Sequence, residues 1–108
     1  MKMIGSVIML KRGADEEYER LHKNVWPEVL LQIRRSNIIN YSIFKYERRN
    51  ETFLFSYFEY VGADFATDMK KMADDPKTQE WWRLTDPLQE RVPEAKGGEW
   101  WHELQKVF

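Results

Sequence analysis

The chain contains no cysteine. It therefore has no disulfide framework, no thiol nucleophile and no thiolate metal site. No apolar run approaches the roughly 20 residues of a membrane-spanning helix. The N-terminus lacks a convincing signal-peptide cleavage site, so we expect a cytoplasmic protein with no membrane partner. The net charge is also small, because 17 Lys and Arg residues nearly balance 18 Asp and Glu residues. This balance gives no electrostatic ground for a nucleic-acid partner.

Motifs for several kinds of chemistry are also missing. The chain has no HExxH, no P-loop, no GxGxxG and no GxSxG. These absences argue against zinc-protease, nucleotide-binding and serine-hydrolase chemistry. The two histidines do not have metal-ligand spacing, and Asp and Glu form no dense cluster with them. We therefore expect no metal site.

Aromatic residues are plentiful. Five Trp, five Tyr and six Phe make up 15% of the 108 residues. The length predicts a single domain over residues 1–108. A hydrophobic fraction of 43% with 32% charged residues is typical of a globular protein. Aromatic side chains fill cores and interfaces, and they also stack on sugars and other ring ligands.

Hydrophobic periodicity predicts the order strand, helix, strand, strand, helix, strand. The expected segments are a strand over 3–11, a helix over 14–35, a hairpin of strands 38–46 and 52–60, helices over 63–73 and 75–82, a loop over 87–98 and a strand over 100–108. Asp15 is a plausible N-cap for the first helix. This order is the split βαβ pattern, so the predicted fold class is α+β, a ferredoxin-like βαββαβ sandwich.

Both faces of the predicted hairpin are apolar. Strict alternation would place Ile39, Tyr41 and Ile43 on one face and Ile38, Phe44 and Tyr46 on the other. Helices cover one face of such a sheet, and a chain of this length has no second layer for the other face. A homodimer that packs sheet against sheet would cover it, and a ligand pocket would cover part of it.

The first helix carries a histidine on its apolar face. Tyr18 lies four residues before His22 and Trp26 four after it, so a continuous helix would place the three on one stripe. Pro27 cannot donate to the carbonyl of Lys23, so the helix should kink or restart beside His22. A buried histidine can be a simple core residue, but histidine also suits proton transfer near neutral pH.

Other polar and aromatic residues allow two interpretations each. His102 beside Trp100 and Trp101 is expected to pack or to lie at the surface. Trp81 and Trp82 point about 100° apart on a helix, so one can pack inside while the other lines a cleft. Tyr41 needs a hydrogen-bond partner if it is buried. Asp86 could bind sugar hydroxyls, but a capping role after the helix is the preferred interpretation.

These segments together resemble a known family. EEYERLHKNVWPE, INYSIF, TFLFSYFEY, QEWWRLTDPLQE and LQKVF are similar, in this order, to the L-rhamnose mutarotase family. The resemblance covers almost the whole chain. It implies a domain that dimerises as an α/β barrel and interconverts the α and β anomers of L-rhamnose, or of a related 6-deoxy sugar such as L-fucose, without a cofactor.

The resemblance also implies roles for single residues. His22 would be the acid/base residue, and Tyr18, Tyr41, Trp81 and Trp82 would contact the sugar. Ring opening needs one general acid and one general base, with a water or a tyrosine as a relay.

Three other functions remain open, because a fold alone does not determine activity. A dimeric α/β-barrel monooxygenase, a non-catalytic sugar-binding protein and a plain dimerisation module would all suit such residues. A haem-using monooxygenase would show a Soret band after reconstitution, and a dimerisation module would show no ligand-dependent change in tryptophan fluorescence.

Overall fold

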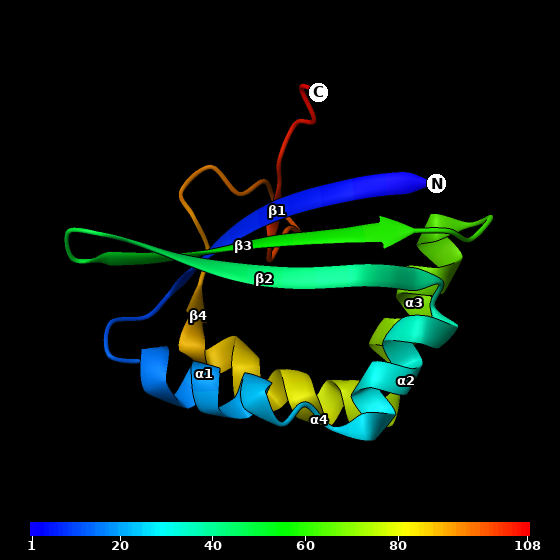
Figure 1. The fold of residues 1–108 in the computed structure, drawn as a ribbon, viewed down its shortest axis with the longest axis horizontal. Coiled ribbons are helices and arrows are strands. Elements are labelled where there is room, and N and C mark those ends of the chain that lie inside the picture. The colour runs from blue at the N-terminus through cyan, green and yellow to red at the C-terminus, as the bar shows by residue number, and fades with distance from the viewer.

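The computed structural model of the protein describes all residues from 1 to 108. Helices lie on one side of a curved antiparallel sheet, and the C-terminal segment lies on the other side (Figure 1). The elements in chain order are β1 (Lys2–Leu10), α1 (Asp15–Lys23), α2 (Pro27–Arg35), β2 (Ile38–Arg48), β3 (Glu51–Tyr60), α3 (Phe65–Asp74), α4 (Pro76–Thr85), the 3₁₀ turn η1 (Asp86–Leu88), β4 (Gln89–Glu90) and β5 (His102–Glu103). The sheet order is β2-β3-β1-β4, with β5 also paired to β1. The predicted α+β class is confirmed, and the strand order agrees with a split βαβ arrangement.

The central strand β1 is covered on both faces. On the helix side, Ile8 and Leu10 form a buried cluster with Leu54 of β3 and Tyr18 of α1. On the opposite side, Val7 and Met9 pack against Val92, which belongs to the C-terminal segment. The near-continuous apolar pattern of this strand therefore reflects two separate packing layers, as the sequence predicts.

The segment expected as one helix over 14–35 is two helices. α1 ends at Lys23 and α2 begins at Pro27, with extended backbone at Trp26. Proline is well suited to the first position of a helix because it needs no N–H partner there. The predicted restart is therefore confirmed. The N-cap prediction was wrong, because Asp15 is the first helical residue and Ala14 occupies the cap position without a side-chain hydrogen bond.

A β-bulge in β2 changes which residues face the helices. Asn40 has a φ of 51°, and the register with β3 shifts between Ile39 and Ser42. The extra residue reverses the alternation, so Ile38 lies on the helix side together with Tyr41, and Ile39 lies on the open side. The faces derived from strict alternation were therefore wrong for Ile38 and Ile39.

The end of the chain is less regular than the sequence predicts. The strand expected over 100–108 is limited to His102 and Glu103, which pair with Val7 and Ser6 of β1. One further backbone hydrogen bond runs from Leu104 N to the Gly5 carbonyl at 2.7 Å. Part of the expected loop over 87–98 is instead η1 and β4. β4 and β5 therefore occupy successive stretches of the same free edge of β1.

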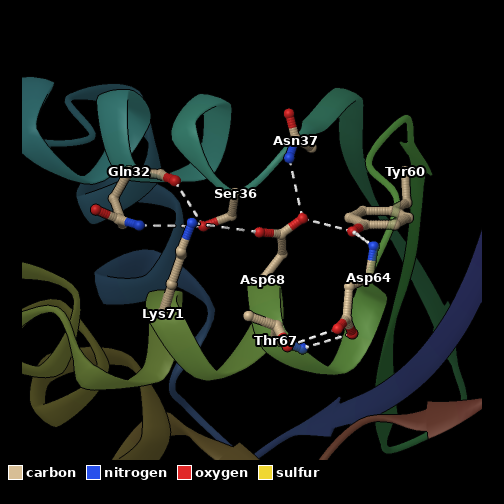
Figure 2. A network of polar contacts seen from close by, with 8 residues as sticks. All are labelled: Gln32, Ser36, Asn37, Tyr60, Asp64, Thr67, Asp68 and Lys71. Carbon is tan, nitrogen blue, oxygen red and sulfur yellow. Dashed lines mark hydrogen bonds and ion pairs between the residues drawn. The ribbon is translucent and has the colours of Figure 1, made fainter.

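A polar network joins α2, β3 and α3 at one end of the sheet (Figure 2). Asp68 of α3 accepts hydrogen bonds from the Asn37 amide at 2.9 Å and from the Tyr60 hydroxyl at 2.5 Å. Lys71 lies 3.8 Å from the same carboxylate. These contacts lower the pKa of Asp68, the Tyr60 hydrogen bond most of all. The network therefore links α3 to the end of β3 and to Asn37, in the turn after α2.

The face of the sheet opposite the helices is largely apolar and partly uncovered. Exposed side chains on this face are Ile39 (40%), Phe44 (65%), Tyr46 (51%) and Phe55 (38%).

None of the helices has the length and apolar character that a membrane-spanning segment needs.

Candidate active site

His22 lies at the end of α1 with its ring orientation fixed. Its Nδ1 is 2.9 Å from the carbonyl oxygen of Tyr18. A carbonyl oxygen can only accept, so Nδ1 carries a proton and Nε2 of the neutral ring is an acceptor. The Tyr18 ring stacks on the imidazole with 4.2 Å between centroids. Burial lowers the pKa of His22 below 6.5, and the hydrogen bond to the Tyr18 carbonyl offsets part of this effect. His22 is therefore a neutral base at pH 7.

Trp81 of α4 forms the wall beside the histidine. Its ring meets His22 edge-on at 5.3 Å and Trp26 edge-on at 5.4 Å. Trp81 is 6% exposed, so this aromatic group is part of the packed interior. Trp26 does not continue the stripe of α1, because the helix ends before it. It reaches the site through Trp81 instead.

A chain of hydrogen bonds reaches the Tyr18 hydroxyl from the other side. The Gln89 Nε2 group donates to the Tyr18 hydroxyl at 3.1 Å. The Trp100 Nε1–H donates to Gln89 Oε1 at 2.6 Å. Gln89 belongs to β4, where it pairs with Leu10, and it is 4% exposed. Three segments far apart in the sequence therefore determine the environment of one hydroxyl.

Tyr41 and Asp86 complete the polar part of the site. Burial is the main cause that raises the pKa of Tyr18, and the Tyr41 and Asp86 side chains raise it further. Burial also raises the pKa of Tyr41 to about 12. Tyr41 is 39% exposed. It faces the helices on the same side of β2 as Ile43, and its ring lies 5.4 Å from that of Phe58.

Asp86 is the C-cap residue of α4, and it caps through its backbone. Its N–H donates to the Trp82 carbonyl, and its own carbonyl accepts from the Gln89 N–H that closes η1. The capping position preferred from the sequence is therefore confirmed, and the carboxylate takes no part in these hydrogen bonds. Burial raises the pKa of the Asp86 carboxyl above 3.8. Its other interpretation, as a ligand for sugar hydroxyls, agrees with this position.

Trp82 points away from Trp81, as adjacent residues on a helix must. It lines an open cavity of about 450 Å³ together with Gln79, Arg83, Asp86 and Pro87. Asp86 thus borders this cavity and also acts on Tyr18. A second cavity of about 230 Å³ lies between the loop after β1 and the β2–β3 hairpin, and none of the predicted site residues lines it.

The structure brings three of the five predicted site residues together. His22 contacts both Tyr18 and Trp81, whereas the aromatic partner of Tyr41 is Phe58. Trp82 lies on the adjacent cavity. His102 is separate and pairs with Glu99 at 3.0 Å, which agrees with the structural role expected for it. Sequence reasoning missed Gln89, because it lies in a segment expected to be a loop, and Trp100, which was noted only as a neighbour of His102.

Comparison with known proteins connects this geometry to an activity. Residues 3–108 match the family model for L-rhamnose mutarotase. The chain belongs to the L-rhamnose mutarotase family. It is therefore a mutarotase, an isomerase of 6-deoxy sugars, in agreement with the resemblance found in the sequence.

Relatives and one solved structure agree with this assignment. The L-rhamnose mutarotase of Oceanobacillus iheyensis is 30% identical over 88 residues, which cover 82% of this chain and 80% of that protein. The L-fucose mutarotase of Xanthomonas campestris is 31% identical over 96 residues, which cover 85% and 73%. The crystal structure of an L-rhamnose mutarotase from Formosa agariphila superposes with a TM-score of 0.75 at 20% identity, covering 100% of this chain and 97% of that one. This last likeness shows the fold that mutarotases of the family share.

Proposed function

We propose that the protein interconverts the α and β anomers of L-rhamnose, with His22 as the proton-transfer residue. The proposal rests on how the imidazole of His22 is held. Its Nδ1–H is held by the Tyr18 carbonyl, and its Nε2 is left as a base among aromatic rings. Such rings suit the apolar C–H face and methyl group of a 6-deoxy sugar.

The reaction needs little beyond a base and an acid. Nε2 of His22 takes the proton of the anomeric hydroxyl while the bond from the anomeric carbon to the ring oxygen breaks. The ring oxygen then takes up a proton, and the aldehyde rotates and closes again on either face. Both protons return on closure, so nothing is consumed. One C–O bond breaks and re-forms while protons are transferred, and no atom changes its oxidation state overall, which agrees with an activity that needs no cofactor.

Sugar contacts are assigned to four further residues. Tyr18 and Trp81 border the imidazole, Tyr41 lies on the helix side of β2, and Trp82 extends the binding surface along the open cavity. Asp86 would accept hydrogen bonds from sugar hydroxyls at the junction of the two regions.

The quaternary structure is part of the proposal. The exposed Phe44 and Tyr46 lie on the open face of the sheet. Two such faces packed together would form the dimeric α/β barrel that the sequence resemblance implies. The cytoplasmic location expected from the sequence stays a prediction.

The decisive experiment is anomer exchange measured by saturation-difference proton NMR at equilibrium. We expect the protein to accelerate exchange of L-rhamnose, with L-fucose and D-glucose measured alongside. The His22→Asn variant should lose this acceleration by about 10²-fold or more, as expected for removal of a general base. His102→Asn is the matched control, because His102 pairs with Glu99 and contacts no predicted site residue.

Each other outcome has a definite meaning. Acceleration of L-fucose alone would keep the chemistry and change the substrate. A folded protein that binds L-rhamnose without accelerating exchange would be a sugar-binding protein. Full activity in a folded His22→Asn variant would overturn the role of His22.

A further inference from the structure

The orientation of the Gln89 side chain is fixed by chemistry. An indole N–H can only donate, so the group that faces Trp100 must be the amide oxygen of Gln89. The amide NH₂ must then face Tyr18, at 3.1 Å from its hydroxyl oxygen. If the amide were flipped, its NH₂ group would face the Trp100 N–H, and two donors would meet without an acceptor. Gln89 therefore reaches Tyr18 only as a donor.

This orientation determines what Tyr18 can offer to a ligand. Its hydroxyl oxygen is occupied by the Gln89 NH₂, so the hydroxyl proton points elsewhere. Within the chain that proton has no acceptor among the hydrogen bonds of Tyr18. That proton is therefore free to donate to a ligand. His22, stacked on the same ring, offers the opposite character, an acceptor at Nε2.

We propose that Gln89 and Trp100 are positioning residues, which hold Tyr18 as the proton donor to the ring oxygen of the sugar. The inference rests on the proposed mutarotase function and names the acid that works beside His22. It concerns β4 and the C-terminal segment, neither of which contributes a residue to the site predicted from the sequence.

The proton balance of the step closes. As His22 Nε2 takes the anomeric proton, the electron pair of the breaking C–O bond moves to the ring oxygen, which takes the Tyr18 proton. The products are the open-chain aldehyde, an imidazolium and a phenolate. On closure, the same oxygen attacks the carbonyl carbon and returns its proton to Tyr18, and the imidazolium returns its proton to the new anomeric oxygen. Burial raises the pKa of Tyr18, so the free site holds the phenol protonated at neutral pH.

The sharpest test is Gln89→Glu. A carboxylate can only accept, so it would take hydrogen bonds from both Trp100 and Tyr18 and turn the tyrosine proton away from the sugar. At neutral pH we expect exchange of L-rhamnose to slow by about tenfold or more, chiefly in kcat. Protonation of the introduced carboxylate restores the original pattern, because its C=O accepts from Trp100 and its O–H donates to Tyr18. The activity of the variant relative to the unmodified protein should therefore rise as the pH falls.

Taking this ratio removes the titration of the other groups around the site, because both proteins share them. Those groups are His22 and Tyr18 of α1, Tyr41 of β2 and Asp86 of η1, and the β1 residue opposite Gln89 is the uncharged Leu10. Gln105→Glu is the matched control for the charge change, because Gln105 is exposed in the C-terminal tail. It should leave both the rate and the ratio unchanged.

A second variant covers the case in which the Gln89→Glu protein does not fold. Trp100→Phe removes the donor that locks the amide, so Gln89 can flip and exchange should slow several-fold. Trp101→Phe is its control, because Trp101 packs against the core cluster without donating a hydrogen bond. If a folded Gln89→Glu or Trp100→Phe variant exchanged L-rhamnose anomers at the normal rate at neutral pH, the positioning role of these residues would be overturned. The proposed mutarotase function would be unaffected. No acceleration by the unmodified protein would instead overturn the proposed function.

Discussion

His22 and Tyr18 are four residues apart on one helix and present opposite hydrogen-bonding characters. The Tyr18 carbonyl fixes the imidazole tautomer, and the Gln89 amide fixes the phenol. In the proposed mechanism, the same residue orients the base through its backbone and supplies the acid through its side chain. A helix makes this arrangement natural, because residues i and i+4 lie one above the other.

The shifted pKa of His22 gives a pH prediction with a definite sign. Burial lowers that pKa, so the protonated, inactive ring appears only below the usual 6.5. We expect kcat/KM for anomer exchange to rise with pH through an apparent pKa below 6.5 and to be level at neutral pH. The measurement is exchange NMR over a pH series, with the uncatalysed rate subtracted. An apparent pKa above 6.5 would contradict the buried, neutral histidine.

At the scale of elements, the sequence predicts best where one residue acts on its own segment. Pro27 breaks the first helix because it lacks an N–H, and the i to i+4 spacing brings Tyr18 to His22. Prediction fails where partners are distant. The Asn40 bulge depends on pairing with β3, and Gln89 meets Tyr18 across 71 residues. Neither contact leaves a periodic signal in the chain.

The network in Figure 2 requires a glycine beside it. A Cβ built on Gly62 would lie 2.4 Å from the Tyr60 hydroxyl and 2.6 Å from an Asp68 carboxylate oxygen. Gly62→Ala must therefore displace the hydrogen bond between those two side chains. We expect a loss of about 1–3 kcal/mol in the free energy of unfolding, as for other overpacked sites.

Thermal or urea denaturation would measure this loss. Gly97→Ala is the matched control, because nothing lies within 4 Å of a Cβ at Gly97. An unchanged stability in Gly62→Ala would mean that the turn after β3 can shift without cost.

For the whole molecule, the two faces of the sheet are buried to different degrees. The helices bury Ile8 and Leu54 on one side, whereas Phe44 on the other side is 65% exposed. A chain of this size cannot cover a broad second face itself. The composition shows many aromatic residues, but only the register shows how they divide, with Tyr41 on the helix side and Phe44, Tyr46 and Phe55 on the open side.

Replacing Phe44 tests whether a second copy covers that face. A charge there would be buried without a partner in a sheet-to-sheet dimer, so Phe44→Glu should shift a dimer toward monomer. Sedimentation velocity would measure the change. Leu30→Glu is the control, because Leu30 is 53% exposed on α2, on the helix side of the sheet. A dimer that tolerates Phe44→Glu as well as Leu30→Glu would place the interface elsewhere.

The short strands at the free edge of β1 affect how much of the time the site is fully ordered. β4 and β5 pair with β1 over two residues each, and Trp100 lies between them in the chain. Segments with so few backbone contacts open locally at a smaller free energy than the whole domain needs to unfold. Whenever the C-terminal segment lifts off, the Gln89 amide is released and Tyr18 can turn its proton freely. The fraction of molecules with an oriented acid is then governed by this local opening equilibrium, while the helices and the central sheet stay folded.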